Sequence, residues 1–571
     1  MRLSRVLAFA ALLATACSPS AGPITAGAPG GPAGKPALGG ELDEAARARQ
    51  VLDRLTFGAR PGDLDAIERM GVDAWVEQQL TPERIPDRVA DSVLALLETQ
   101  RKQPYELIAD HPEPNELVPR LQGRIMPDST RVPPTARDSA EYETARKTDA
   151  QLSAEITPAK VIRAALSDRQ LLEVMTDFWE NHFSVSINKS PNRYAIVEYD
   201  RDVIRPHALG RFRDLLGAVA KSPMMLYYLD NFQSQVDSLH PTAPEGRIEA
   251  LRRLDGPPLG DTLLTRLVNH RRAGINENYA RELMELHTLG VDGGYTQHDV
   301  TEVARCFTGW TIDRPDLGGS FLFRQDWHDG GAKVVLGTPI PAGRGIEDGE
   351  EVLDMLARHP STAHFIAKKL VTHFVSDSAP PALVERAAQT FLRTDGDIRE
   401  VMRTIILSPE FNSRAAYRAK VKTPFELVMS TLRAMNAAPD TTQRYAQLVA
   451  RLGQPIFAHL TPEGWPDQGA AWMNAGALLN RLNFGTQVGA NQIPGMTIAN
   501  WRPAQRLASE GPEEQVNGVI ATLLDGDATS ATRDALLAVQ PPPPPIDRAH
   551  ALRYLGELVG VAIGSPEFQH R

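Results

Sequence analysis

Apolar residues recur every three or four positions along most of the chain, which is the period of an amphipathic helix. Polar stretches with glycine or proline separate these segments and set their limits. The pattern predicts helices over residues 44–55, 63–80 (two helices divided at Gly71), 159–183, 199–221, 263–272, 276–289, 297–308, 349–374, 380–393, 397–407, 420–436 and 441–452. The expected fold class is therefore all-α, a multi-helical body.

One region favours strands instead of a helix. Residues 320–324 and 333–336 are rich in strand-forming side chains, and Gly330 and Gly331 lie between them. The pattern predicts one small β-hairpin beside the helical body, with residues 327–331 at its tip.

Three stretches interrupt the helical pattern. Residues 101–148 are polar and contain prolines, which predicts an irregular insertion. Residues 236–262, rich in proline, glycine and charge, predict a second insertion, a surface loop. The prolines of 541–545 predict a stiff spacer before the last helix.

The N-terminus has the features of an export signal. Basic residues precede a short apolar run, 6–13, which is too short to span a bilayer as a helix. Small residues directly before Cys17 form a candidate lipobox, so we interpret 1–17 as a signal peptide and Cys17 as the acylated first residue of the mature protein. The alternative is ordinary cleavage nearby and a soluble periplasmic protein. Residues 18–40 are mostly glycine, alanine and proline, a flexible tether before the helical domain at 41–571.

The net charge and the cysteine content limit the partners and the location that we expect for the protein. The net charge of −10 argues against nucleic acid, which requires a basic surface. Cys306 is the one cysteine besides Cys17, so a chain lipidated at Cys17 has no internal disulfide. We expect an exported protein of the periplasm or cell envelope that touches the membrane only through its lipid anchor.

Several short segments carry specific motifs. They are 55–62, 177–183 (Asp-Phe-Trp-Glu-Asn-His-Phe), 276–290, 294–297 with 309–310, 327–329 with Lys333 and Gly337, and 464–466 (Gly-Trp-Pro). Together these motifs resemble the bacterial family catalogued as domain of unknown function 1800, over about residues 45–571. The resemblance implies a secreted, largely helical protein without an established reaction. It also implies a possible partner, because the family is frequently encoded beside secreted sulfatase- or phosphatase-like proteins.

The segment 276–289 offers two carboxylates for chemistry. At 100° per residue, Arg281, Glu282 and Glu285 fall on one stripe of the helix. Two carboxylates one turn apart can ligate a divalent metal or act as acid and base. The simpler interpretation is an Arg281–Glu285 ion pair on an ordinary polar face.

Two histidines complete the candidate catalytic residues. His182 lies on the apolar face of its helix, either as a core residue or as a group available to a cleft. His328 lies at the predicted hairpin tip beside Asp329 and Lys333, a position typical both of functional loops and of ordinary surfaces. If a divalent metal binds, its candidate ligands are Glu282, Glu285, His182 and His328; no other cofactor can be named.

Two hypotheses from different classes remain. The His-Glu-x-x-His, Gly-x-Ser-x-Gly, P-loop and dinucleotide motifs are missing from the sequence, so their usual enzyme classes lose support. The first hypothesis is an envelope hydrolase or metal-dependent enzyme whose polar cleft receives both the 276–289 stripe and the hairpin tip. The second is a non-catalytic lipoprotein, a scaffold or escort for a secreted partner, in which the same polar residues pair with one another.

Overall fold

Helices dominate the structure. The computed structural model describes residues 39–114, 117–118, 124–125, 131–189, 192–236, 242, 274–543 and 547–571. The first α-helices are α2 (Glu44–Leu55), α3 (Asp63–Met70), α4 (Val72–Leu80), α5 (Arg88–Leu94), α6 (Pro104–Asp110), α8 (Ala136–Leu166), α9 (Gln170–His182), α10 (Asn192–Glu198), α11 (Phe212–Lys221), α12 (Pro223–Tyr228) and α15 (Glu277–Glu285). They are followed by α16 (Gln297–Cys306), α17 (Glu347–Ala357), α18 (Pro360–Phe374), α19 (Pro381–Arg393), α20 (Ile398–Ile406), α21 (Pro424–Ala434), α22 (Arg444–Arg451), α23 (Ala475–Gly489), α24 (Ala504–Leu507), α25 (Pro512–Leu523), α26 (Ser530–Leu537), α27 (Arg548–Gly564) and α28 (Pro566–Gln569). The mainly α-helical class is confirmed.

Some predicted segments lie outside the described residues. They are the signal peptide with Cys17, nearly all of the tether 18–40, the helix 263–272, most of the loop 236–262 and part of the spacer 541–545.

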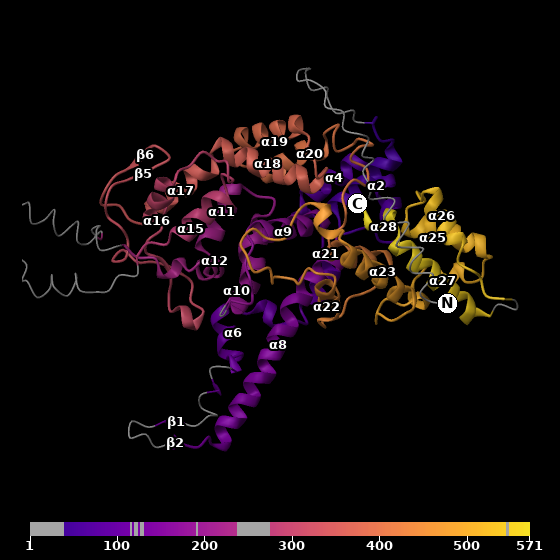
Figure 1. The fold of residues 1–571 in the computed structure, drawn as a ribbon, viewed down its shortest axis with the longest axis horizontal. Coiled ribbons are helices and arrows are strands. Elements are labelled where there is room, and N and C mark those ends of the chain that lie inside the picture. The colour runs from indigo at the N-terminus through magenta and orange to yellow at the C-terminus, as the bar shows by residue number, and fades with distance from the viewer. Residues whose placement is uncertain are drawn as a thin grey trace, which may run out of the picture.

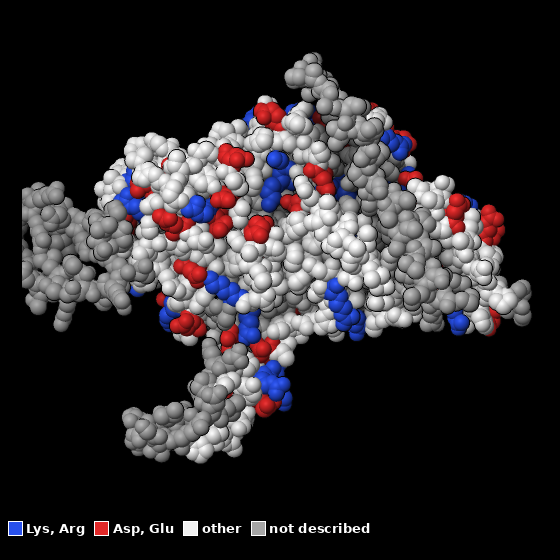
Figure 2. Space-filling view, in the orientation of Figure 1, with Lys and Arg blue, Asp and Glu red and all other residues white. Residues whose placement is uncertain are grey.

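The helices form an elongated body (Figure 1). The helices α15, α16 and α17 lie toward one end, α25, α26 and α27 toward the other, and α9 and α21 in the middle. Buried apolar side chains form one large cluster that extends from Ala48 in α2 to Phe568 in α28. On the face shown in Figure 2, basic and acidic side chains are interspersed. Within the described residues, none of the helices combines the length and the apolar content needed to cross a membrane.

The expectation of an irregular insertion over 101–148 is wrong for the parts of this stretch that form helices. The stretch contains α6 and the first half of α8, a helix of 31 residues. Thr135 and Asp138 form a capping box that begins α8, which the polar composition concealed. The first half of α8 is mostly exposed and projects from the body as an arm, with the short strand pair β1 (Arg124–Ile125) and β2 (Arg131–Val132) at its outer end (Figure 1). The polarity therefore reflects solvent around a helix.

The predicted helix 159–183 is two helices. The chain leaves α8 at Ser167, whose hydroxyl donates to Asp87 Oδ2 at 2.7 Å, and the Asp168 amide donates to Asp87 Oδ1 at 2.9 Å. The Asp168 amide therefore bonds to the Asp87 carboxylate and not to a carbonyl group of α8, which ends the helix. The next helix, α9, starts at Gln170.

Two other predicted helices are also broken. Within 199–221 the chain forms a π-helix (Tyr199–Ile204), a 3₁₀ turn (Arg205–His207) and then α11. Within 349–374 it stops at Ala357, and Pro360 begins α18 in the first-turn position that suits proline.

The expected strand pairing is wrong. The strand β4 (Phe321–Phe323) pairs with β3 (Trp310–Ile312), and β5 (Lys333–Val335) pairs with β6 (Thr338–Ile340), both antiparallel. Leu336 and Gly337 both have positive φ, at 48° and 76°. Such a two-residue turn closes a tight hairpin, so β5 pairs with the strand next to it in sequence.

Candidate functional site

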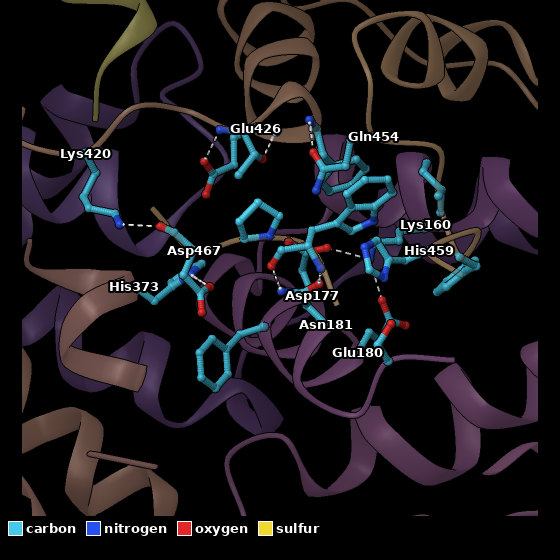
Figure 3. A pocket seen from close by; sticks show the side chains of 18 of the residues that line it. Lys160, Asp177, Glu180, Asn181, His373, Lys420, Glu426, Gln454, His459 and Asp467 are labelled. Carbon is cyan, nitrogen blue, oxygen red and sulfur yellow. Dashed lines mark hydrogen bonds and ion pairs between the residues drawn. The ribbon is translucent and has the colours of Figure 1, made fainter. Parts of the chain in front are cut away.

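A pocket of about 70 Å³ lies where distant parts of the chain meet. Its walls come from α8, α9, α18 and α21, from the segment 454–467 that follows α22, and from Arg571. In Figure 3, Lys420, His373 and Asp467 lie on one side, Lys160, Glu180 and His459 on the other, and Asp177 and Asn181 between them. The lining therefore combines acids, bases and imidazoles from segments up to several hundred residues apart.

The helix α9 supplies one polar wall of the pocket. Asp177, Glu180 and Asn181 line it, and their spacing of three and four residues puts them on one face of α9. From α8, the Lys160 ammonium group contacts Asp177 Oδ1 and Glu180 Oε2, both at 2.5 Å. Burial raises the pKa of Glu180 to about 8, despite the opposing charge of Lys160.

Two hydrogen bonds attach the segment 454–467 to α9. The Asn181 amide group donates to the Trp465 carbonyl at 2.8 Å and accepts from the Trp465 amide at 2.7 Å. Gly464 has a φ of +74°, and a Cβ atom there would collide with Asn181. Glycine is therefore required before Trp465, which explains the Gly-Trp-Pro motif.

The opposite wall is centred on Asp467. Its carboxylate lies 3.8 Å from His373 Nδ1 and 4.0 Å from Lys369 Nζ, and its carbonyl accepts from Lys420 Nζ at 2.7 Å. Burial opposes ionisation of Asp467, but His373 and the Lys369 charge hold its pKa below the usual value. Lys420 also pairs with Asp377.

The Arg571 guanidinium fixes the state of His373. It lies 3.2 Å from His373 Nε2 and 2.8 Å from Glu426 Oε1. A guanidinium only donates, so Nε2 accepts and the imidazole proton lies on Nδ1, toward Asp467. Burial and the Arg571 charge lower the pKa of His373, so the ring is neutral.

The residues of the 276–289 stripe lie outside the pocket lining. Arg281 donates to Gln297 at 2.6 Å, and Glu285 accepts from the Tyr295 hydroxyl at 3.1 Å. Glu282 is partly buried; burial and the charges of Glu285 and Glu463 raise its pKa. The stripe contacts α16 through Gln297 and the turn before α16 through Tyr295.

His182 lies in the core, also outside the lining. It is 2% exposed, packs against Phe178, Trp179 and Phe183, and its Nε2 donates to the His287 carbonyl at 3.1 Å. Burial lowers its pKa well below the usual value. The structure thus places His182 beside His287 and not beside Glu282 and Glu285.

His328 does not lie at an exposed tip, so that expectation is wrong. It is fully buried, with Nε2 3.2 Å from Asp348 Oδ2, and Lys333 Nζ lies 2.7 Å from the same oxygen. Asp329 is buried as well and pairs with Arg305 at 2.7 Å. The segment 327–333 therefore anchors an internal ion network.

The five predicted catalytic residues do not converge on one site. Among the described residues, no group of three or more His, Cys, Asp or Glu side chains is placed to hold a metal ion. The sequence contained a signal for the actual pocket, since Asp177, Glu180 and Asn181 belong to one motif and Trp465 to another. No local pattern pointed to Lys420, Asp467 or Arg571, which join the pocket through tertiary folding alone.

Comparison with known proteins identifies a family and nothing more specific. No curated protein and no solved structure matches the chain. A family model described as "Protein of unknown function (DUF1800)" matches residues 50–570, which is nearly the whole chain. The protein therefore belongs to the DUF1800 family.

Proposed function

We propose that the protein is an exported envelope hydrolase that acts on a polar group held in the pocket between α9 and α21, with Glu180 as proton donor. The observation that carries the proposal is the convergence of ionisable side chains from distant segments in one pocket, including a carboxyl group with a raised pKa. In the reaction, the bond to the leaving group breaks and the leaving group takes the Glu180 proton. Water supplies hydroxide to the substrate, and its remaining proton restores Glu180.

The pocket dimensions favour a small reacting group on a larger molecule. About 70 Å³ has room for only a few non-hydrogen atoms. Phe425, Phe457 and Trp465 lie around this space and provide flat apolar surface beside it. A polymer end or a modified surface group fits these dimensions.

The pairing of carboxylates with cationic side chains favours acid–base catalysis over a metal-dependent enzyme. Each carboxylate of the lining has a cationic side chain beside it: Asp177 and Glu180 share Lys160, Glu426 has Arg571, and Asp467 has Lys369. These cations occupy the positions beside the carboxylates that a divalent ion would need.

A substrate screen with matched variants tests the proposal. The full chain is incubated with nitrophenyl esters, nitrophenyl glycosides and purified peptidoglycan, and released products are measured. We expect turnover of at least one substrate, lost by at least about 100-fold in Glu180→Gln, because positioned proton donors typically contribute that much. Asp202→Asn is the control, since Asp202 is largely exposed and pairs with Arg201. Turnover that survives Glu180→Gln, or none on any substrate, contradicts the proposal.

One observation favours the scaffold or escort as a second candidate function. The projecting half of α8 is a polar, mostly exposed helical arm, the kind of surface a partner can hold (Figure 1). The partner expected from the family resemblance is a secreted sulfatase- or phosphatase-like protein. Co-purification of that protein, abolished by alanine at Arg137, Glu141 and Arg146 on the arm, would support the escort. Unchanged co-purification with these substitutions would show that the partner does not bind the arm.

A further inference from the structure

Seven ionisable side chains form two neighbouring groups of buried ion pairs, and the first group lies at the pocket wall. Glu173, Asp177 and Glu180 come from α9; the others are Lys160 and Arg163 of α8, and Asp200 and Arg205 of the π-helix and the 3₁₀ turn after it. The most exposed of these side chains, Asp177, is 21% exposed, and Glu180 is 4% exposed. These side chains therefore lie largely out of contact with water.

Each cation lies beside at least one of the carboxyl groups. Lys160 lies 2.5 Å from both Asp177 and Glu180. Arg205 lies 2.9 Å from Asp200 and 2.7 Å from Glu173. Arg163 lies 4.0 Å from Asp200.

The charges of these seven side chains do not balance unless one carboxyl group is protonated. They comprise four carboxyl groups and three cations. An excess buried negative charge is costly, and arginine does not lose its proton. The neighbouring carboxyl groups raise the pKa of Lys160 even though burial opposes this, so the lysine also stays charged. One proton must therefore reside on a carboxyl group.

The hydrogen-bonding pattern places that proton on Glu180. Glu180 Oε1 is buried and, as a carboxylate oxygen, has no donor within reach among the described residues. A protonated Glu180 can donate to the Asp200 carboxylate. The pKa of Asp200 is lowered despite its burial, by the charges of Arg205 and Arg163 and by the hydrogen bond from Glu180.

The other groups nearby do not supply this proton. The Tyr199 hydroxyl donates to the Phe183 carbonyl at 2.8 Å, and burial raises its pKa well above the usual value, so it stays neutral. The ionisable groups of the opposite pocket wall pair with one another: Asp377, Lys420, Asp467, His373, Arg571 and Glu426.

We propose that Glu180 and Asp200 share one proton at neutral pH, and that Asp200 is the positioning residue that keeps it on Glu180, the member that lines the pocket. Use of the proton in a reaction rests on the function proposed above. The shared proton itself does not depend on that function, and it can be measured without a substrate.

Infrared spectroscopy tests the shared proton directly. A protonated carboxyl group has a C=O stretching band that an ionised one lacks, and isotopic labelling of glutamate shifts that band when it belongs to a glutamic acid. We expect a glutamate band at neutral pH in the wild-type protein and its loss in Glu180→Gln. Asp200→Asn should also abolish the band, because three carboxyl groups then face three cations and Glu180 ionises against Lys160. Asp202→Asn should keep it.

A second variant keeps the test decisive if Asp200→Asn does not fold. Lys160→Met leaves four carboxyl groups against two cations, so the protonated-carboxyl signal should about double. A wild-type protein without the band, or an Asp200→Asn protein that keeps it, overturns the proposal. An inactive protein that shows the band would contradict the proposed hydrolase and leave the shared proton standing.

Discussion

His182 and His287 illustrate how burial determines the state of single residues in this protein. Their ring centres are 6.3 Å apart, and each ring has one buried nitrogen without a partner among the described residues. Burial, with the Lys369 charge adding to it, lowers the pKa of His287 to about 3. Both rings are therefore neutral at physiological pH, and protonating either inside the core is unfavourable.

Acid should destabilise the protein through these histidines. The ordinary pKa of His287 is 6.5 and its folded value is about 3. Between these two pH values the unfolded chain binds a proton at this residue and the folded protein does not. The stabilisation is complete above pH 6.5 and is lost as the pH falls toward about 3. Urea unfolding from neutral to acidic pH should show a smaller loss in His287→Gln than in the wild type. His298→Gln, at an exposed position, should behave as the wild type.

At the scale of elements, the sequence predicted helices well where their limits are local. The pair α3 and α4 divides at Gly71, which has positive φ, and α20 starts at the Asp397 cap, so both were predictable. The break between α8 and α9 was not, because it depends on Asp87, some 80 residues away in sequence. The helical arm was missed since the sequence pattern for a core-facing helix requires an apolar stripe, and an exposed helix has none.

The contact between α23 and α27 should not tolerate side chains at its glycines. A Cβ atom at Gly489 would collide with the Gly556 carbonyl, and one at Gly485 would press on the Gly560 carbonyl. Gly489→Ala should lower the free energy of unfolding by about 1–3 kcal/mol through overpacking. Gly476→Ala in the same helix meets only Asn474 and should be neutral or slightly stabilising. Equal effects of the two substitutions in chemical denaturation would contradict the close contact.

At the scale of the whole molecule, folding assembles the pocket from parts that sequence patterns do not connect. Asp177 and Glu180 were within reach of motif analysis because they share one helix face. Lys420, Asp467 and Arg571 were not, since each is brought in by long-range packing that leaves no periodic trace. The same packing separates Glu282 and Glu285 from His328, which the sequence had suggested as one site.

The projecting arm should be nearly independent of the body in stability. Arg137 and Glu141 form an exposed ion pair one turn apart, and replacing both with alanine should change the free energy of unfolding by less than about 0.5 kcal/mol. Leu152, where α8 enters the body, is fully buried, and Leu152→Ala should cost about 2–5 kcal/mol. A large effect of the arm substitutions on thermal or urea unfolding would show that the arm contributes to the folded body.

The length of α8 joins two distant parts of the molecule. One continuous helix of 31 residues, about 46 Å long, carries the exposed arm at its outer end and Lys160 near its inner end. Pro158 lies two residues before Lys160 and removes one backbone hydrogen bond there. The helix that carries the exposed arm therefore also positions the ammonium group that pairs with Asp177 and Glu180 at the pocket wall.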